Sequence, residues 1–121
     1  MIITVDKFSA YTGVFTDNVE LQESYLLSSQ NIVTDYLAYN PEYQLLHHIT
    51  GELEDINDIS EIPEIIQLTI MRIAAILQSE SNSNIEVTSK QFGDSASRTF
   101  INTVDFSKYL MQISQYRKIR I

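Results

Sequence analysis

The stretch from Ile62 to Leu77 places the strongest limit on the fold of this 121-residue chain. If the stretch is helical, apolar residues cover nearly its whole circumference, so other elements must bury it on most sides. Pro63 stands in the expected first turn, where its missing N–H costs nothing. The stretch is too short and, with Arg72, too polar to span a membrane. We therefore expect residues 62–77 to form the central helix of a single domain over residues 1–121.

Two amphipathic helices are expected ahead of the central one. Thr4 and Gly13 stand where a short helix over Val5–Thr12 would begin and end. Asp17, with Glu20 three residues later, has the spacing of a capping box and is expected to begin a long helix. Apolar and aromatic residues recur along that helix at steps of three, four or seven: Leu21, Tyr25, Leu26, Ile32, Val33, Tyr36, Leu37 and Tyr39.

The chain between the long helix and the central one is expected to be less regular. The long helix should end before Asn40-Pro41, because proline restricts the residue that precedes it. A shorter helical segment is predicted over Glu42–Ile49, ahead of Gly51. Residues 52–62 then form an acidic connector.

The spacing of apolar residues changes after the polar residues 79–84. Residues 85–90 alternate between the two faces of an expected strand, and residues 91–101 resemble a turn and a return strand. Because a two-stranded hairpin is marginal alone in water, it needs the helical body or a neighbour to support it. Asp105 is placed to cap a last helix with these residues on its apolar side: Phe106, Tyr109, Leu110, Ile113 and Tyr116. The sequence thus predicts a mostly α fold, a compact bundle of four or five helices with one β-hairpin-like excursion near residues 85–101.

Charge is divided unevenly along the chain. Residues 1–88 carry fourteen Asp and Glu against two bases, a net charge of −12, whereas residues 89–121 carry six bases against two acids, a net charge of +4. The bases end in a tail, residues 117–121, that alternates charge with isoleucine. An acidic body and a basic tail indicate charge-complementary assembly, with the tail poorly ordered in an isolated subunit and fixed on assembly. Simple solvation of the helix surfaces is the other interpretation.

The sequence contains no pattern typical of catalysis, of a cofactor or of a metal site. There are no cysteines. His47 and His48 are adjacent, so on a helix they point about 100° apart and do not chelate one ion together. Residues 55–58 lack the spacing and the glycine of a calcium loop. Residues 93–97 resemble neither a nucleophile elbow nor a phosphate-binding loop. We expect no enzyme activity and no cofactor.

The order of these elements resembles the head–tail connector proteins of tailed bacteriophages, also called head-completion or adaptor proteins. The resemblance rests on a short capped helix over residues 3–13, a buried helix that opens at Ile62-Pro63-Glu64, and a basic end. Between them lies a segment of the form Ser89-x-x-Phe92-Gly93-Asp94-x-Ala96-x-Arg98-x-Phe100. The likeness covers nearly the whole chain, although the acidic residues 52–61 and the double histidine are not part of it.

The resemblance implies a structural virion protein. Such a subunit forms a ring, usually of twelve copies, between the portal protein and a tail-side stopper or tail-terminator protein, and it extends the DNA channel without sequence-specific binding. The expected locations are the head–tail interface of the virion and, during assembly, the host bacterial cytoplasm. No membrane partner is expected. The residues expected to make contacts between subunits or with the portal are Phe92, Gly93, Asp94, Arg98, Arg117, Lys118, Ile119, Arg120 and Ile121.

Two other functions stay open at the level of the sequence. One is a small monomeric phage- or prophage-encoded regulatory protein that binds a partner through its basic tail. The other is a small hydrolase whose site assembles from His47, His48 and the acidic connector.

Overall fold

A computed structural model describes residues 1–47, 49–83 and 106–118. The named elements are α1 (Val5–Thr12), α2 (Val19–Leu37), β1 (Gln44–Leu46), β2 (Leu53–Asp55), the 3-10 turn η1 (Ile59–Glu61), α3 (Glu64–Ser83) and the 3-10 helix η3 (Met111–Tyr116). Residues 106–110 are α-helical and continue into η3, and we call residues 106–116 the C-terminal helix. The predicted class, mostly α with a β-hairpin, is confirmed.

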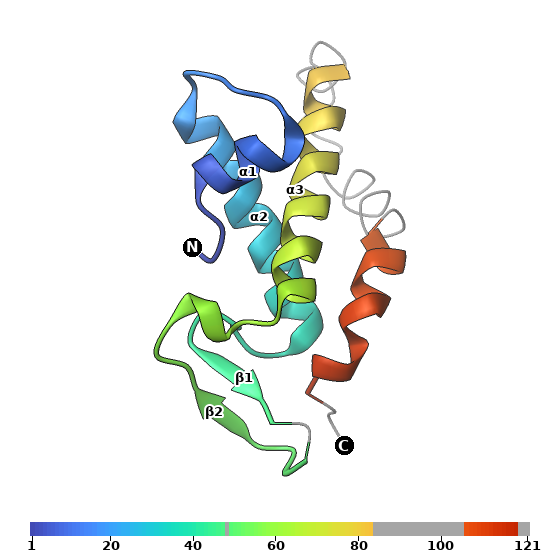
Figure 1. Ribbon diagram of the computed structural model, residues 1–121. Helices are drawn as coiled ribbons and strands as arrows, with labels where there is room; N and C mark the ends of the chain where they lie inside the picture. The colour runs from blue at the N-terminus through green and yellow to red at the C-terminus, as the bar shows by residue number, and fades with distance from the viewer. Residues whose placement is uncertain (48, 84–105, 119–121) are drawn as a thin grey trace.

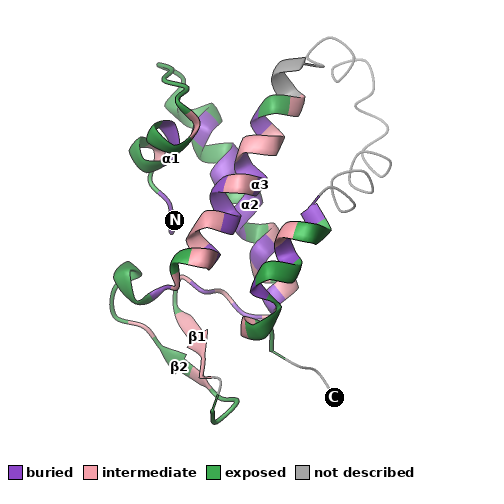
Figure 2. Cartoon of the chain, turned by 45° about the vertical axis from the view of Figure 1, so that its right-hand side comes forward, coloured by how far each residue is buried: buried purple, intermediate pink, exposed green. Residues whose placement is uncertain are grey.

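The helices α2 and α3 form the centre of the molecule. They lie side by side and run in opposite directions (Figure 1). The C-terminal helix packs against α3, and α1 contacts both long helices. Buried residues follow the sides of α2, α3 and the C-terminal helix that face one another (Figure 2). The hairpin extends from the end of the pair where α2 stops and α3 begins (Figure 1).

The short helix α1 forms where its caps predict it. The Thr4 hydroxyl accepts a hydrogen bond from the Lys7 amide at 3.1 Å, which satisfies one of the free donors of the first turn. Gly13 ends the helix in the left-handed region at φ 75°, and its amide donates to the Ser9 carbonyl. Phe8 lies fully buried on the inner side and fastens α1 to the core.

The prediction that Asp17 caps the long helix is wrong by one residue. The cap is Asn18, whose side-chain oxygen accepts a hydrogen bond from the Leu21 amide at 3.2 Å. Asp and Asn are about equally good caps, so two adjacent candidates are not separated by propensity. The long helix ends at Leu37, ahead of the proline as predicted.

The buried side of α2 is more polar than its sequence pattern predicts. The predicted stripe divides into five buried residues, two half-buried ones and one exposed one: Tyr25, Leu26, Val33, Leu37 and Tyr39; Ile32 and Tyr36; and Leu21. Gln22, Ser29 and Gln30 are buried beside the apolar members. Buried polar side chains are stable only when they are hydrogen-bonded, so their partners set how α2 is seated.

Two of these partners lie on α3. The Gln78 side-chain amide donates to the Gln22 side-chain oxygen at 3.2 Å. The Ser29 hydroxyl donates to the Ile70 carbonyl at 2.5 Å. The two bonds lie about two turns apart on each helix and run in opposite order along the chain, so together they define one antiparallel register.

The central helix α3 is buried as predicted, with its most buried side formed by Ile66, Ile70, Ile73 and Ala74. It begins at Glu64, two residues after the predicted start at Ile62, so Pro63 directly precedes the helix and does not lie in its first turn. The polar break predicted over residues 79–84 begins later than expected, because the helix continues to Ser83. Gln78 supplies a reason for the extra turn, since its buried side chain pairs with Gln22.

The segment predicted as a short helix over Glu42–Ile49 is instead the first half of a hairpin. The antiparallel register pairs Gln44 with Asp55 and Leu46 with Leu53, within the predicted acidic connector. A short apolar run is ambiguous between helix and strand, and pairing with a segment several residues away decided this one. Gly51 at φ 72° permits the tight loop between the strands. The apolar side of the hairpin packs against the core through Leu45, Leu46, Leu53 and Ile56.

The C-terminal helix buries the apolar residues that the sequence assigned to it. Phe106, Leu110 and Ile113 are buried, and Tyr109 and Tyr116 are half-buried. Asp105, its predicted cap, lies outside the described residues, as does the β excursion predicted near residues 85–101.

Shortening a buried side chain of α3 should destabilise the protein strongly. Ile70 has no exposed surface, so Ile70→Ala removes packed atoms and leaves a cavity, at an expected cost of about 2–5 kcal/mol in the free energy of unfolding. Urea denaturation followed by circular dichroism measures the change. Met111→Ala, at a side chain that is 69% exposed, is the control and should change stability by less than about 0.5 kcal/mol. A cost below about half a kcal/mol for Ile70→Ala would show that α3 is not the centre of the core.

Candidate functional site

The basic end of the chain is fixed to the carboxyl-terminal end of α2. The Tyr39 hydroxyl donates to the Tyr116 carbonyl at 2.7 Å and accepts from the Leu46 amide at 3.4 Å. The Lys118 amide donates to the Leu37 carbonyl at 2.9 Å. Burial raises the pKa of Tyr39, which keeps the hydroxyl protonated and able to donate. One tyrosine therefore joins α2, β1 and the end of the C-terminal helix.

Four cations lie on the C-terminal helix, against it or directly after its last residue, and we call them the basic surface: Lys108, Arg72, Arg117 and Lys118. The guanidinium of Arg117 stands 5.0 Å from the centre of the Tyr36 ring. Arg72 and Lys108 stand 5.8 Å and 5.2 Å from the centre of the Tyr109 ring. Cation–π contacts of this length hold a cation in place while leaving its charge available to a partner.

The cations of the basic surface have no carboxylate partner within the described part of the chain. There, the single ion pair joins the Met1 ammonium to Glu42. Arg72 donates to the neutral side-chain oxygen of Gln112 at 2.9 Å. Lys108, Arg117 and Lys118 are exposed. The surface therefore offers positive charge to an acidic partner.

The residues predicted to make contacts are placed only in part. Arg117 and Lys118 lie on the basic surface, and their contacts with α2 differ from the expectation of a tail that is free in the isolated subunit. Ile119, Arg120 and Ile121 lie outside the described residues. The same holds for Phe92, Gly93, Asp94 and Arg98.

Sequence reasoning missed two residues of this region. Arg72 is one of only two bases in the acidic residues 1–88, but the fold brings both Arg72 and Lys108 to the Tyr109 ring. Tyr39 belonged to a predicted apolar stripe, but its hydroxyl carries the contacts that position the chain end. No linear signal identifies either role, because each depends on which helices lie next to each other.

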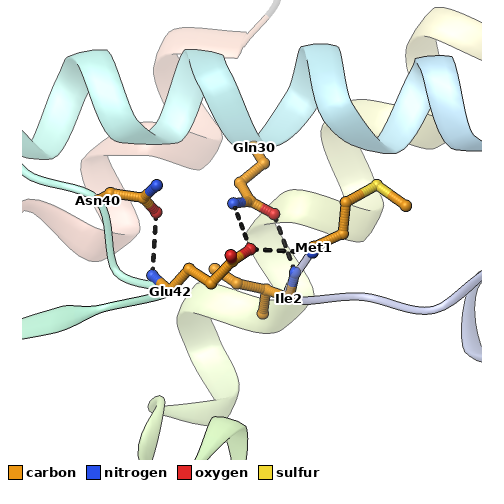
Figure 3. A network of polar contacts seen from close by, with 5 residues as sticks. All are labelled: Met1, Ile2, Gln30, Asn40 and Glu42. Carbon is orange, nitrogen blue, oxygen red and sulfur yellow. Dashed lines mark hydrogen bonds and ion pairs between the residues drawn. The ribbon is translucent and has the colours of Figure 1, made fainter.

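A second polar network fixes the amino terminus (Figure 3). The Gln30 side chain accepts from the Ile2 amide and donates to a Glu42 oxygen, at 2.9 Å and 3.0 Å. The same Glu42 oxygen lies 3.0 Å from the Met1 ammonium. Asn40 accepts from the Glu42 amide and so sets the turn that aims this carboxylate. The network holds the first residues against α2 and against the start of the hairpin.

His47 belongs to the loop of the hairpin. Its ring Nδ1 accepts from the Thr50 amide at 3.3 Å, and its backbone bonds to Glu52 and Gly51 close the loop. Among residues 1–47, 49–83 and 106–118, no three histidine or acidic side chains converge on a point where they could hold a metal ion. His48 lies outside the described residues.

Comparisons with protein-family models, with curated proteins and with solved structures found no match. Within the part of the chain that is described, no helix has the length and apolar character needed to cross a membrane.

Removing the Tyr39 hydroxyl should loosen the basic end of the chain. Tyr39→Phe leaves the Tyr116 carbonyl and the Leu46 amide without this partner, at an expected cost of about 1–2 kcal/mol in the free energy of unfolding. Amide hydrogen exchange at Lys118 should become faster than in the wild type. Tyr11→Phe, at an exposed tyrosine, is the matched control. Equal exchange at Lys118 in both variants would contradict the role assigned to Tyr39.

The Glu42 network should make stability depend on pH in a defined direction. Hydrogen bonding by Gln30, and next the Met1 ammonium, lowers the pKa of Glu42 in the folded protein. This contribution to stability is therefore complete above the unfolded-state pKa of about 4.3 and is lost as the pH falls through the folded-state value. Glu42→Gln should lower stability at pH 7 by about 1–2 kcal/mol, and the difference from the wild type should shrink toward pH 3. Urea denaturation at both pH values tests this, and a difference that grows on acidification would refute it.

Proposed function

We propose that this protein is a head–tail connector subunit of a tailed bacteriophage, which assembles as a ring between the portal and the tail. The observation that carries the proposal is the basic surface: cations without carboxylate partners in the described chain, held on a chain of net charge −8. A positive surface on an acidic protein suits a partner that is itself acidic, and another copy of the chain is such a partner.

The positions of the elements support the same proposal. The resemblance to connector proteins depends on a short capped helix near residues 3–13 and on a buried helix that opens at residues 62–64. Helices occupy both places, as α1 and α3. The chain end that follows is the expected place for contacts with a neighbour or with the portal, and its described part is exposed.

An acidic body would serve such a ring in a second way. The exposed carboxylates of the body repel phosphate, so a channel that they line would let DNA pass without sticking. In this arrangement the basic surface faces protein neighbours and lies away from the genome. A ring of about twelve copies is the size that the resemblance implies.

Neutralising the basic surface should weaken assembly on the portal. In Arg117→Gln with Lys118→Gln, the loss of two exposed charges should reduce co-purification with the portal protein of the same virus. The wild-type complex should weaken as salt is raised, because exposed charge pairs are screened within about 10 Å at 0.1 M salt. Native mass spectrometry and negative-stain electron microscopy measure ring formation.

The matched control is Lys7→Gln, which removes one cation elsewhere on the surface, where Lys7 bonds to Gln67. It should assemble as the wild type does. Failure of the wild-type chain to bind the portal or to form rings would refute the proposed function. Equal assembly of the Arg117 and Lys118 variant would refute the role of the basic surface.

A further inference from the structure

An acidic groove lies beside the first turns of α2, whereas Arg117 and Lys118 of the basic surface lie at the carboxyl-terminal end of that helix. It has a volume of about 330 Å³ and is lined by residues from the start of the chain, α1 and the first turns of α2. Ile3, Val5 and Val19 give it apolar walls, and Asp6 and Glu23 supply two carboxylates. A groove of this size accommodates a few side chains.

The two carboxylates have no cationic partner in the described chain. The nearby base Lys7 directs its ammonium to the Gln67 side-chain oxygen at 2.6 Å, on α3. The Met1 ammonium, the other cation at the groove, is already paired with Glu42 at 3.0 Å. Asp6 and Glu23 are both exposed. The groove therefore combines apolar walls with uncompensated negative charge.

The end of the chain itself carries side chains that complement the groove. Residues 117–121, Arg-Lys-Ile-Arg-Ile, combine three cations with two isoleucines. In extended form, such a segment would present Ile119 and Ile121 on one face, together with Arg117, and Lys118 and Arg120 on the other. It thus fits a groove with apolar walls and carboxylates.

The backbone of the segment does not extend as far as Glu23, the groove carboxylate on α2 of its own subunit. The Lys118 amide is bonded to the carbonyl of Leu37, at the last residue of α2, whereas Glu23 is in the second turn. The fourteen residue steps from Glu23 to Leu37 span about 21 Å along the helix. Three further residues extend at most about 10 Å. Figure 1 shows α1 beside the first half of α2 and the end of the C-terminal helix level with the other end.

We propose that the groove binds the C-terminal segment, residues 117–121, of a second copy of this chain. The contact joins two different surfaces, so it is head-to-tail, and such contacts generate a ring when the rotation between copies closes. The inference rests on the proposed function and specifies it, since it names the surface of the neighbour that receives the basic end.

The test is a titration of the isotope-labelled full-length chain with a peptide of residues 115–121, followed by nuclear magnetic resonance. Saturable shifts are expected at Ile3, Val5, Asp6, Val19 and Glu23. Asp6→Asn with Glu23→Gln should weaken binding about fivefold or more, since each exposed ion pair contributes up to about a factor of five. A peptide with serine in place of both isoleucines should bind more weakly still.

Asp35→Asn is the matched control, because Asp35 is an exposed acid of α2 outside the groove. It should bind the peptide as the wild type does. Shifts confined to other surfaces, absence of binding, or equal affinity in the groove variant would overturn the inference.

The experiment separates this inference from the proposed function. If the chain binds the peptide in the groove but forms no ring with the portal, the inference stands and the connector role is refuted. If the chain forms rings with the portal and the groove variant assembles equally well, the connector role stands and the inference is refuted.

Discussion

The antiparallel contact between α2 and α3 determines where the other described elements lie. Its apolar part resists separation of the helices, and its two buried polar bonds, Gln22 to Gln78 and Ser29 to the Ile70 carbonyl, resist sliding. A shift by one turn would leave these polar groups buried without partners, at a cost of about 1–3 kcal/mol for each group. The hairpin leaves the pair at one end, where the amino-terminal network joins Gln30 to Glu42, and α1 lies beside the other half of α2 (Figure 1). The register of one helix pair thus separates the acidic groove from the basic surface.

Much of the helical framework follows from local sequence. The caps at Thr4 and Gly13 and the apolar run after Pro63 predict α1 and α3, because caps and helical spacing act within a few residues. The predictions that were wrong concern elements whose structure depends on partners distant in the sequence. The strand Gln44–Leu46 forms because residues 53–55 pair with it, and α3 continues past Leu77 because Gln78 has a buried partner on α2. Neither interaction leaves a periodic signal in the sequence.

The candidate site, too, could be predicted from the sequence only in part. The basic character of residues 117 and 118 could be read directly from the chain, and both lie exposed at its end. Arg72 and the acidic groove could not be predicted. Arg72 acquires its role from the neighbouring Tyr109 ring, and Asp6 and Glu23 become one surface only when α1 lies beside the start of α2. Linear charge counts show how much charge a chain carries, whereas the fold decides which charges act together.

The central claim is that one subunit carries two different and complementary surfaces, the acidic groove beside the first turns of α2 and the basic chain end at the last turn of that helix. Mixing two full-length variants tests it most directly. One variant neutralises Asp6 and Glu23, and the other neutralises Arg117, Lys118 and Arg120. Each keeps one working surface, so a head-to-tail contact predicts monomers of each variant alone and a heterodimer that grows no further when they are mixed at high concentration. Native mass spectrometry resolves these species. Homodimers of either variant alone, or no heterodimer in the mixture while the wild-type chain self-associates under the same conditions, would contradict the account.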